Sequence, residues 1–343
     1  MNANVSRISS SGSTRRCLVV VFALAFAPAS VLTPTTVLGQ APPFQLQWGT
    51  LGFYDGEFNF SDVAGITLDA TGNVYVCDNG NFRVQKFDSN GGFLLKWGPN
   101  GSAPRIFPIH TPNAIAVDDS GFVYTASSGG RIHKFTSDGN LITEWGESGS
   151  GTGEFRGCYG IAITGTTLYA TDRDNRRVQV FTTSGVFLSA WGVGGTAAGQ
   201  LAAPYDIAVE TAGTVLVLDG LRPFRVQRFT STGQHLLTIG SAGTGDGQFS
   251  FPIKLAVGPN GNIYVVDSDN HRIQVFSPSG SFLTKWGGGP NNTPGFFDYP
   301  QGIAVDPLGQ VYVLDSHNFR IQKFGPVTPT RSTTWGRLKS IYR

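Results

Sequence analysis

The chain repeats one short pattern six times, and this repeat limits its fold more than any other feature. An arginine followed by Val or Ile and then by Gln or His recurs at intervals of 46 to 48 residues, with a Phe four residues after each arginine. An Ile-Ala-Val-like segment precedes each arginine, and a Trp-Gly pair follows the first five, with Ile239 replacing Trp in the fourth copy. Periods of this size indicate stacked supersecondary units. The arginines are Arg83, Arg131, Arg177, Arg225, Arg272 and Arg320.

Each copy has room for four short strands, which we call a, b, c and d in chain order. Pro-Asn-Gly separates a from b and Pro-Ser-Gly separates c from d in the fifth copy, and both are turn sequences. A single four-stranded sheet cannot bury both faces, but six sheets arranged radially bury each face against a neighbour. The sequence therefore predicts an all-β, six-bladed β-propeller of four-stranded antiparallel blades. The expected strands of the fifth copy are residues 254–257, 262–267, 272–276 and 281–286.

An N-terminal segment matches the last strand of a copy, although no strands a to c precede it. Phe44-Gln-Leu-Gln-Trp48-Gly49 has the spacing of Phe93-Leu-Leu-Lys-Trp97-Gly98. We expect it to supply strand d of the sixth blade and so to close the ring, which protects an open sheet edge. Residues 333–336, Thr-Thr-Trp-Gly, are the competing segment, but they are one residue out of register and follow two prolines.

Three elements of the copies resemble NHL repeats. They read Gly-x-Phe…Pro-x-Gly-Ile-Ala-Val-Asp, Tyr-Val-x-Asp-x-x-Asn-x-Arg-Ile-Gln-x-Phe and Phe-Leu-x-x-Trp-Gly, and residues 247–276 and 295–324 are the clearest copies. The resemblance covers residues 44–324. The second copy departs from it by lacking the Asp and Asn, and the fourth has Gly-Leu-Arg-Pro-Phe between Asp219 and Arg225. The resemblance implies a six-bladed propeller that most often serves as a binding platform.

The N-terminal 39 residues differ from the rest and are predicted to be a signal peptide. Arg7, Arg15 and Arg16 precede an uncharged apolar run at residues 17–27, which is too short for a typical membrane-spanning helix. Cleavage after Gly39 is preferred and cleavage after Ala29 is the alternative. The pair Arg15-Arg16 also fits a twin-arginine signal. A general secretory signal and an uncleaved N-terminal anchor are the alternatives. We expect export to the periplasm or the exterior, with the propeller at residues 40–325 and a basic tail at 326–343.

Charge and cysteine content exclude several classes. The formal charge of the whole chain is +2. All charged residues of the signal and of the tail are basic, three in the signal and four in the tail, so residues 40–325 have a formal charge of −5. We therefore expect no nucleic-acid partner, no membrane span in the mature chain, and a monomer. Cys77 and Cys158 lie in copies that are not neighbours, so we expect two buried thiols rather than a disulfide.

Recurrent Asp/Arg pairs at the b–c loops are the first candidate site. Read as function, a ring of carboxylates on one face would bind a metal or perform acid/base chemistry. Read as structure, each Asp ends strand b, each Arg begins strand c, and the pair braces the loop. Repetition in nearly every blade favours structure, because a catalytic site needs different groups at one point. The pairs are Asp78/Arg83, Asp172/Arg177, Asp219/Arg225, Asp267/Arg272 and Asp315/Arg320.

Positions where the copies disagree are the better candidates for ligand contacts. The d–a and b–c loops of a propeller share one face, and the residues just before the central Ile of strand a are expected to rim the channel. Asp206 and Lys254 replace small residues in adjacent blades, either as an inter-blade ion pair or as ligand contacts. The ligand-binding candidates are Asn113, Tyr159, Arg173, Arg176, Tyr205, Asp206, Arg222, Lys254, His271, Gln301 and His317.

The sequence holds no catalytic constellation, no metal site and no cofactor motif that we can identify. No channel His triad suits zinc, as in the amidating lyases of similar fold, and the few Glu residues do not suit a lactonase-like metal site. We therefore expect a non-catalytic scaffold that binds a protein, peptide or glycan on the d–a and b–c face. The alternative is a metal-assisted lyase or lactonase-like hydrolase acting at the channel mouth.

Overall fold

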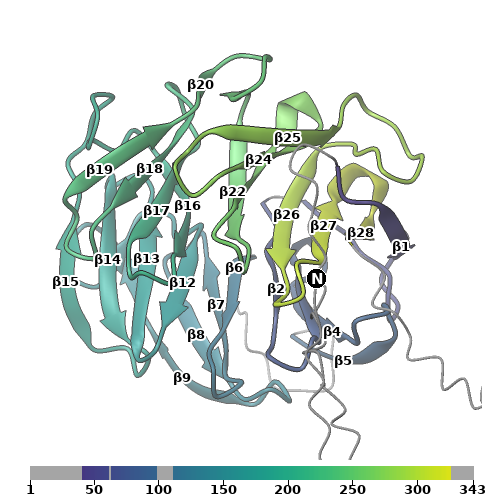
Figure 1. Cartoon of the computed structure of the whole chain (residues 1–343). Coiled ribbons are helices and arrows are strands. Elements are labelled where there is room, and N and C mark those ends of the chain that lie inside the picture. Colours follow the sequence, from purple (N-terminus) through teal and green to yellow (C-terminus); the bar gives the residue numbers. More distant parts are fainter. Residues whose placement is uncertain (1–40, 62, 99–110, 326–343) are drawn as a thin grey trace, which may run out of the picture. The chain divides into compact units, whose positions relative to one another are not determined.

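The computed structural model describes residues 41–61, 63–98 and 111–325, and within them six four-stranded antiparallel sheets form the blades of a β-propeller (Figure 1). The predicted all-β fold and blade number are confirmed. The predicted signal peptide and basic tail lie outside the described residues. In the part of the chain described, no helix is long and apolar enough to cross a membrane. Cys77 and Cys158 are both buried as free thiols.

Each blade takes its strands in chain order from the centre outward, except the last. Blade 1 contains β2 (Ile66–Leu68), β3 (Val74–Asp78), β4 (Arg83–Phe87) and β5 (Phe93–Trp97). Blade 2 contains β6 (Pro112–Val117), β7 (Val123–Ser127), β8 (Ile132–Phe135) and β9 (Leu141–Trp145). Blade 3 contains β12 (Ile161–Thr164), β13 (Thr167–Asp172), β14 (Arg177–Thr182) and β15 (Phe187–Trp191).

The second half of the chain follows the same order. Blade 4 contains β16 (Pro204–Val209), β17 (Val215–Asp219), β18 (Arg225–Phe229) and β19 (His235–Ile239). Blade 5 contains β22 (Pro252–Val257), β23 (Ile263–Asp267), β24 (Arg272–Phe276) and β25 (Phe282–Gly287). Blade 6 contains β26 (Pro300–Val305), β27 (Val311–Asp315), β28 (Arg320–Phe324) and β1 (Phe44–Trp48).

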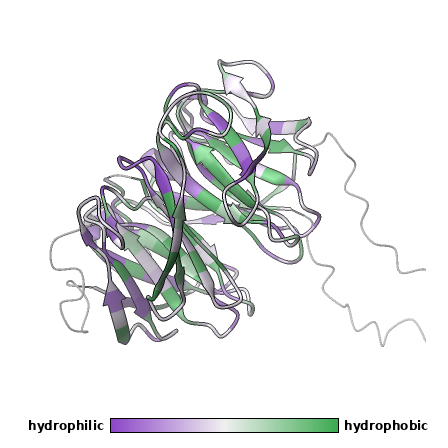
Figure 2. Cartoon of the chain, turned by 90° about the vertical axis from the view of Figure 1, so that its left-hand side faces the viewer, coloured by the Kyte–Doolittle hydropathy of each residue, from purple (hydrophilic) through white to green (hydrophobic). Residues whose placement is uncertain are grey.

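Burial explains the apolar runs of the middle strands. Strands b and c are buried along nearly their whole length, because each sheet packs between two others. Strand b accordingly reads as a nearly continuous apolar run, whereas strand c buries Arg, Gln and Lys together with its apolar residues. The outer strand d instead mixes exposed and half-buried residues, as in β9 and β15. In Figure 2 the hydrophobic residues accordingly lie mainly on the strands.

Strand a begins earlier than predicted, because it contains a bulge. In blade 5 the predicted strand was 254–257, whereas β22 starts at Pro252, with a register shift between Pro252 and Lys254. The same shift occurs between Pro204 and Asp206 in blade 4. A β-bulge interrupts the regular alternation of side chains, and this affects which residues face the channel.

Strand β1 closes the ring as predicted. It pairs antiparallel with β28, with Phe44 opposite Phe324 and Trp48 opposite Ile321. The competing residues 333–336 lie outside the described residues. The Trp48 ring lies 6.4 Å from the Tyr312 ring of blade 6 and 6.0 Å from the Phe87 ring of blade 1. Trp48 therefore joins the last blade to the first.

Several b–c and d–a loops on one face of the propeller contain short regular elements. The b–c loops of blades 1, 5 and 6 contain the 3₁₀ turns η1 (Asn79–Asn81), η2 (Ser268–Asn270) and η3 (Ser316–Asn318). The d–a loops before blades 3 and 5 contain two small parallel pairs. These are β10 (Glu147–Ser148) with β11 (Glu154–Phe155), and β20 (Ser241–Ala242) with β21 (Gln248–Phe249).

Trp48→Ala tests the closure. We expect it to lower the free energy of unfolding by about 3 kcal/mol, because it removes a large ring packed between two blades. Urea denaturation followed by circular dichroism measures the loss. Leu94→Ala is the matched control: Leu94 also lies on a strand d but is 48% exposed, so its loss should stay below about 1 kcal/mol. Equal losses in the two variants would contradict the closing role of Trp48.

Candidate ligand-binding face

A buried arginine holds the d–a loop of blade 1 in place. Arg83 Nε donates to Asp78 Oδ2 at 2.6 Å, and its two terminal nitrogens donate to the carbonyl oxygens of Phe53 at 2.7 Å and Tyr54 at 2.8 Å. The second Asp78 oxygen accepts the backbone N–H of Asn59 at 2.8 Å. The pair therefore connects the b–c hairpin to the loop that enters the same blade.

Four other blades repeat this brace. The Arg–Asp distance is 2.7 Å in three of them and 3.4 Å for Arg225 and Asp219. The remaining pairs are Arg177–Asp172, Arg272–Asp267 and Arg320–Asp315. Burial raises the pKa of the Asp78, Asp219, Asp267 and Asp315 carboxyls, and hydrogen bonds from backbone N–H groups and arginine oppose that rise. These contacts support a bracing role for the five pairs.

Blade 2 lacks this brace. Ser127 stands in place of the aspartate, and Arg131 Nη1 instead donates to Glu144 Oε1 at 3.2 Å on the surface. His133 stands where the other blades have a buried glutamine, and its Nε2 lies 3.2 Å from Glu144 Oε2. The departure that the sequence shows in the second copy is therefore accompanied by a different side-chain network.

Two tyrosines and an arginine stack on the face above blades 3 and 4. The rings of Tyr159 and Tyr205 lie 5.4 Å apart, and the Arg173 guanidinium lies 4.4 Å above the first and 5.4 Å from the second. Arg173 also donates to both oxygens of Asp174, at 2.8 and 3.2 Å. The Tyr205 ring packs edge-on against Phe251 at 5.7 Å. The arginine therefore covers the buried tyrosines and remains 24% exposed itself.

Blades 5 and 6 extend this aromatic surface. The Tyr299 ring stacks on His317 with centroids 4.9 Å apart and an interplanar angle of 10°. The Tyr299 backbone N–H donates to His271 Nδ1 at 3.1 Å, and Asp298 Oδ1 lies 3.4 Å from the same nitrogen. Burial and the neighbouring Asp269 carboxylate raise the pKa of Tyr299 to about 12. We call Tyr159, Tyr205, Phe251, Tyr299 and His317 the aromatic arc.

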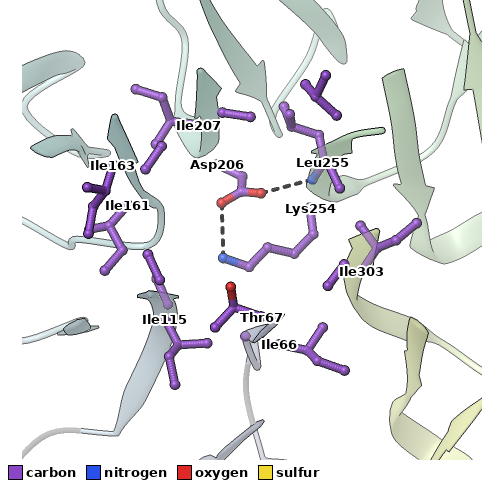
Figure 3. Close-up of a pocket in the computed structure, with 18 of the residues that line it drawn as sticks. Ile66, Thr67, Ile115, Ile161, Ile163, Asp206, Ile207, Lys254, Leu255 and Ile303 are labelled. Atoms are coloured by element: carbon purple, nitrogen blue, oxygen red, sulfur yellow. Dashed lines mark hydrogen bonds and ion pairs between the residues drawn. The ribbon is translucent and has the colours of Figure 1, made fainter. Parts of the chain in front are cut away.

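Asp206 and Lys254 lie inside the channel rather than on its rim (Figure 3). Lys254 Nζ donates to Asp206 Oδ1 at 3.2 Å and to the Tyr159 carbonyl oxygen at 2.6 Å. Asp206 Oδ2 accepts the backbone N–H of Leu255 at 2.9 Å. Burial raises the pKa of the Asp206 carboxyl, and the Lys254 ammonium opposes that rise. The structure therefore shows the inter-blade ion pair, and the role of these residues as ligand contacts stays a prediction.

The remaining predicted candidates do not form one surface. Asn113 is fully buried and accepts the Thr111 hydroxyl at 3.2 Å, and Gln301 is 8% exposed. Arg176 is exposed with a φ of 56°, and Arg222 lies over the Phe224 ring at 5.6 Å. Lys254 is buried in the channel below this face rather than on it.

Two residues of the arc were missed by the sequence analysis. Phe251 and Tyr299 both have left-handed backbones, with φ values of 49° and 54°, which are uncommon for bulky residues. They precede the central Leu255 and Ile303 by four positions, where blades 3 and 4 have Gly157 and Ala203. A comparison of the residues at this repeat position across the six copies would have identified them.

In the described ranges, no group of three or more His, Cys, Asp or Glu residues is arranged to hold a metal ion. Comparisons with known proteins agree with the repeat and the fold. The NHL repeat family matches residues 60–87, 249–276 and 297–324, and the family described as strictosidine synthase-like, N-terminal, matches residues 106–135. Comparison with curated proteins gives no match. The chain therefore contains NHL repeats, and its fold is a six-bladed β-propeller.

Solved propeller structures resemble the chain at low sequence identity. A structural genomics protein of unknown function from Bacteroides thetaiotaomicron has 17% identity and a TM-score of 0.63, covering 82% of this chain and 76% of that one. A streptogramin B lyase has 16% identity and a TM-score of 0.55, with coverages of 79% and 96%. Virginiamycin B lyase from Staphylococcus aureus has 16% identity and a TM-score of 0.52, with coverages of 77% and 84%. At these identities the likeness concerns the fold alone.

Asp315→Ala tests the brace. It leaves the Arg320 guanidinium buried without its carboxylate, so we expect a loss of about 3–5 kcal/mol in the free energy of unfolding, measured in urea. Ser127→Ala is the matched control, because Ser127 occupies the same position in blade 2 and makes only hydrogen bonds to Arg131 backbone atoms. Its loss should be about 1 kcal/mol or less. A loss of that small size for Asp315→Ala would show that the pair does not brace the loop.

Proposed function

We propose that the protein is a non-catalytic binding module that recognises a protein or peptide partner on the face formed by the d–a and b–c loops. The observation that carries this proposal is the aromatic arc with Arg173 stacked across two of its rings. Tyrosine and arginine are the residues that most often dominate binding energy at protein interfaces. They offer large contact areas together with hydrogen-bond donors.

The braces support the same proposal. A ligand meets a surface whose loops are held by buried ion pairs and backbone hydrogen bonds, so little loop ordering accompanies binding. The half-exposed groups on this surface are Arg173, Phe251, Tyr299 and His271, and His317 is 57% exposed. Asp174, Asp269 and Asp298 lie beside Arg173, Tyr299 and His271 and add negative charge to this surface. Mixed charge around an aromatic centre suits a folded or extended polypeptide.

Export is part of this proposal. It rests on the arginines and the uncharged run at residues 17–27, which have the order of a secretory signal. A partner would then be met in the periplasm or outside the cell. The formal charge of −5 for residues 40–325 also argues against a nucleic-acid ligand.

A metal-assisted lyase or lactonase-like hydrolase is the second candidate. The fold similarity to the streptogramin B and virginiamycin B lyases is the observation behind it. Elemental analysis of the purified protein separates the two candidates. Stoichiometric zinc or calcium that resists dialysis would favour the metal-assisted candidate over the binding module.

Binding to the arc is tested with peptides selected from a random displayed library on the purified propeller, and with a panel of oligosaccharides. Calorimetry should show that the selected peptides lose affinity at least about tenfold, or about 1.4 kcal/mol, for Arg173→Ala and for Tyr299→Ala. Leu188→Ala is the control, because Leu188 is 51% exposed on the outer strand β15, away from the arc residues. Unchanged affinity in both arc variants would show that this face is not the binding surface, and binding of oligosaccharides alone would assign it to glycans.

A further inference from the structure

The propeller axis holds a cavity of about 280 Å³ that is lined by the six inner strands. One aliphatic side chain from each blade forms a ring around it (Figure 3). Further Ile, Leu and Val residues line the cavity two positions later along the strands. The side chains of the lining are therefore mostly aliphatic, while polar atoms make up the larger part of its exposed surface. The ring consists of Ile66, Ile115, Ile161, Ile207, Leu255 and Ile303.

Three polar side chains interrupt this aliphatic lining, and each is an exception to the repeat. Asp206 and Lys254 stand where the other four blades have Gly or Ala. Thr67 stands where the other five blades have Ala. All three belong to the lining of the same cavity, and Figure 3 shows them together inside the ring. The other blades have Gly or Ala at these positions, so the fold does not require the three polar side chains.

The two ends of the cavity differ in exposure. The ion pair of Asp206 and Lys254 lies at the start of the inner strands, under the face with the aromatic arc. Along the inner strands, exposure rises from buried residues at the start to half-buried or exposed residues at the end. The more exposed end, at the a–b turns, is therefore the entrance. It lies on the face opposite to the d–a and b–c loops, where the sequence analysis expected the ligand.

The ammonium of Lys254 has one donor left for a ligand. It carries three N–H groups, and the described residues supply two acceptors, Asp206 Oδ1 and the Tyr159 carbonyl oxygen. Lys254 is 5% exposed and lines the cavity, so its third donor can be reached only through the cavity. A buried donor without an acceptor is costly. The Thr67 hydroxyl, which also lines the cavity, is a second donor.

We propose that the channel binds a small neutral molecule with an apolar body and one carbonyl oxygen, such as a ketone, ester or lactone. The carbonyl oxygen accepts from Lys254 Nζ and from the Thr67 hydroxyl, and the body packs within the aliphatic ring. The ion pair already balances its own charge. A carboxylate would add an unbalanced negative charge at a buried site, which is strongly unfavourable.

Size sets a limit on this ligand. A buried apolar cavity of about 150 Å³ holds benzene. A cavity of about 280 Å³ therefore suits a molecule of roughly ten non-hydrogen atoms. This is smaller than the volume of about 300–1,000 Å³ that is usual for sites of drug-sized ligands.

The test uses three probes of similar length: 2-octanone, octanoate and n-heptane. The protein carries ¹³C-labelled isoleucine methyl groups, and the probes are titrated while the methyl NMR spectrum is recorded. We expect 2-octanone to shift the methyl signals of the five ring isoleucines in a saturable way. Ile142 is 48% exposed on an outer strand and Ile273 lies in the core between blades, so their signals should stay in place. Absence of ring shifts at the solubility limit of 2-octanone would overturn the proposal.

Two variants test the polar contacts. Thr67→Ala introduces the residue of the other five blades, and we expect 2-octanone to bind it several-fold more weakly. The double variant Asp206→Ala with Lys254→Met leaves no unpaired buried charge, and its affinity for 2-octanone should fall at least about tenfold. The affinity for n-heptane, which has no acceptor, should change little in both. Unchanged 2-octanone binding in the double variant, or tighter binding of octanoate than of 2-octanone to the unmodified protein, would contradict a site for neutral carbonyl compounds.

Discussion

The buried aspartate at the end of strand b is the interaction on which the candidate binding face depends. In five blades this carboxylate accepts hydrogen bonds from an arginine of strand c and from a backbone N–H of the d–a loop. The arginine in turn donates to loop carbonyl groups. Each loop is thus tied to its own blade by charged groups out of water, where hydrogen bonds to charges are strongest. The sheets supply the frame, and these pairs position the loops on it.

Repetition allows each blade to serve as a comparison for the others. A position that is small in most blades shows what the fold requires there, and a polar or bulky residue at the same position needs another explanation. By this criterion the Asp/Arg pairs are part of the frame. Asp206, Lys254 and Thr67 are exceptions in the channel, and Phe251 and Tyr299 are exceptions on the face. These exceptional residues therefore form both proposed sites. The aromatic arc lies on the face above the Asp206–Lys254 ion pair, and the channel cavity lies below it.

Much of the fold could be predicted from the sequence, because it follows from the repeat. The period determined the blade number, and the match between residues 44–49 and residues 93–98 identified the closing strand. The direction of the Asp206 and Lys254 side chains could not be predicted. It depends on the bulge in strand a, which no pattern of alternation reveals. The left-handed backbones of Phe251 and Tyr299 were also beyond prediction, since Gly or Asn usually adopts that conformation.

The ion pair in the channel is not explained by stability. Removing a carboxylate and an ammonium from water costs several kcal/mol each, and well-packed apolar residues often serve a fold equally well or better. The four blades with Gly or Ala at the same position show that the propeller closes without charged groups there. The Lys254 ammonium also reaches across from blade 5 to the Tyr159 carbonyl of blade 3, directly below the aromatic arc. A charged pair placed there fits the proposed channel ligand, which needs an oriented donor at the buried end of the cavity.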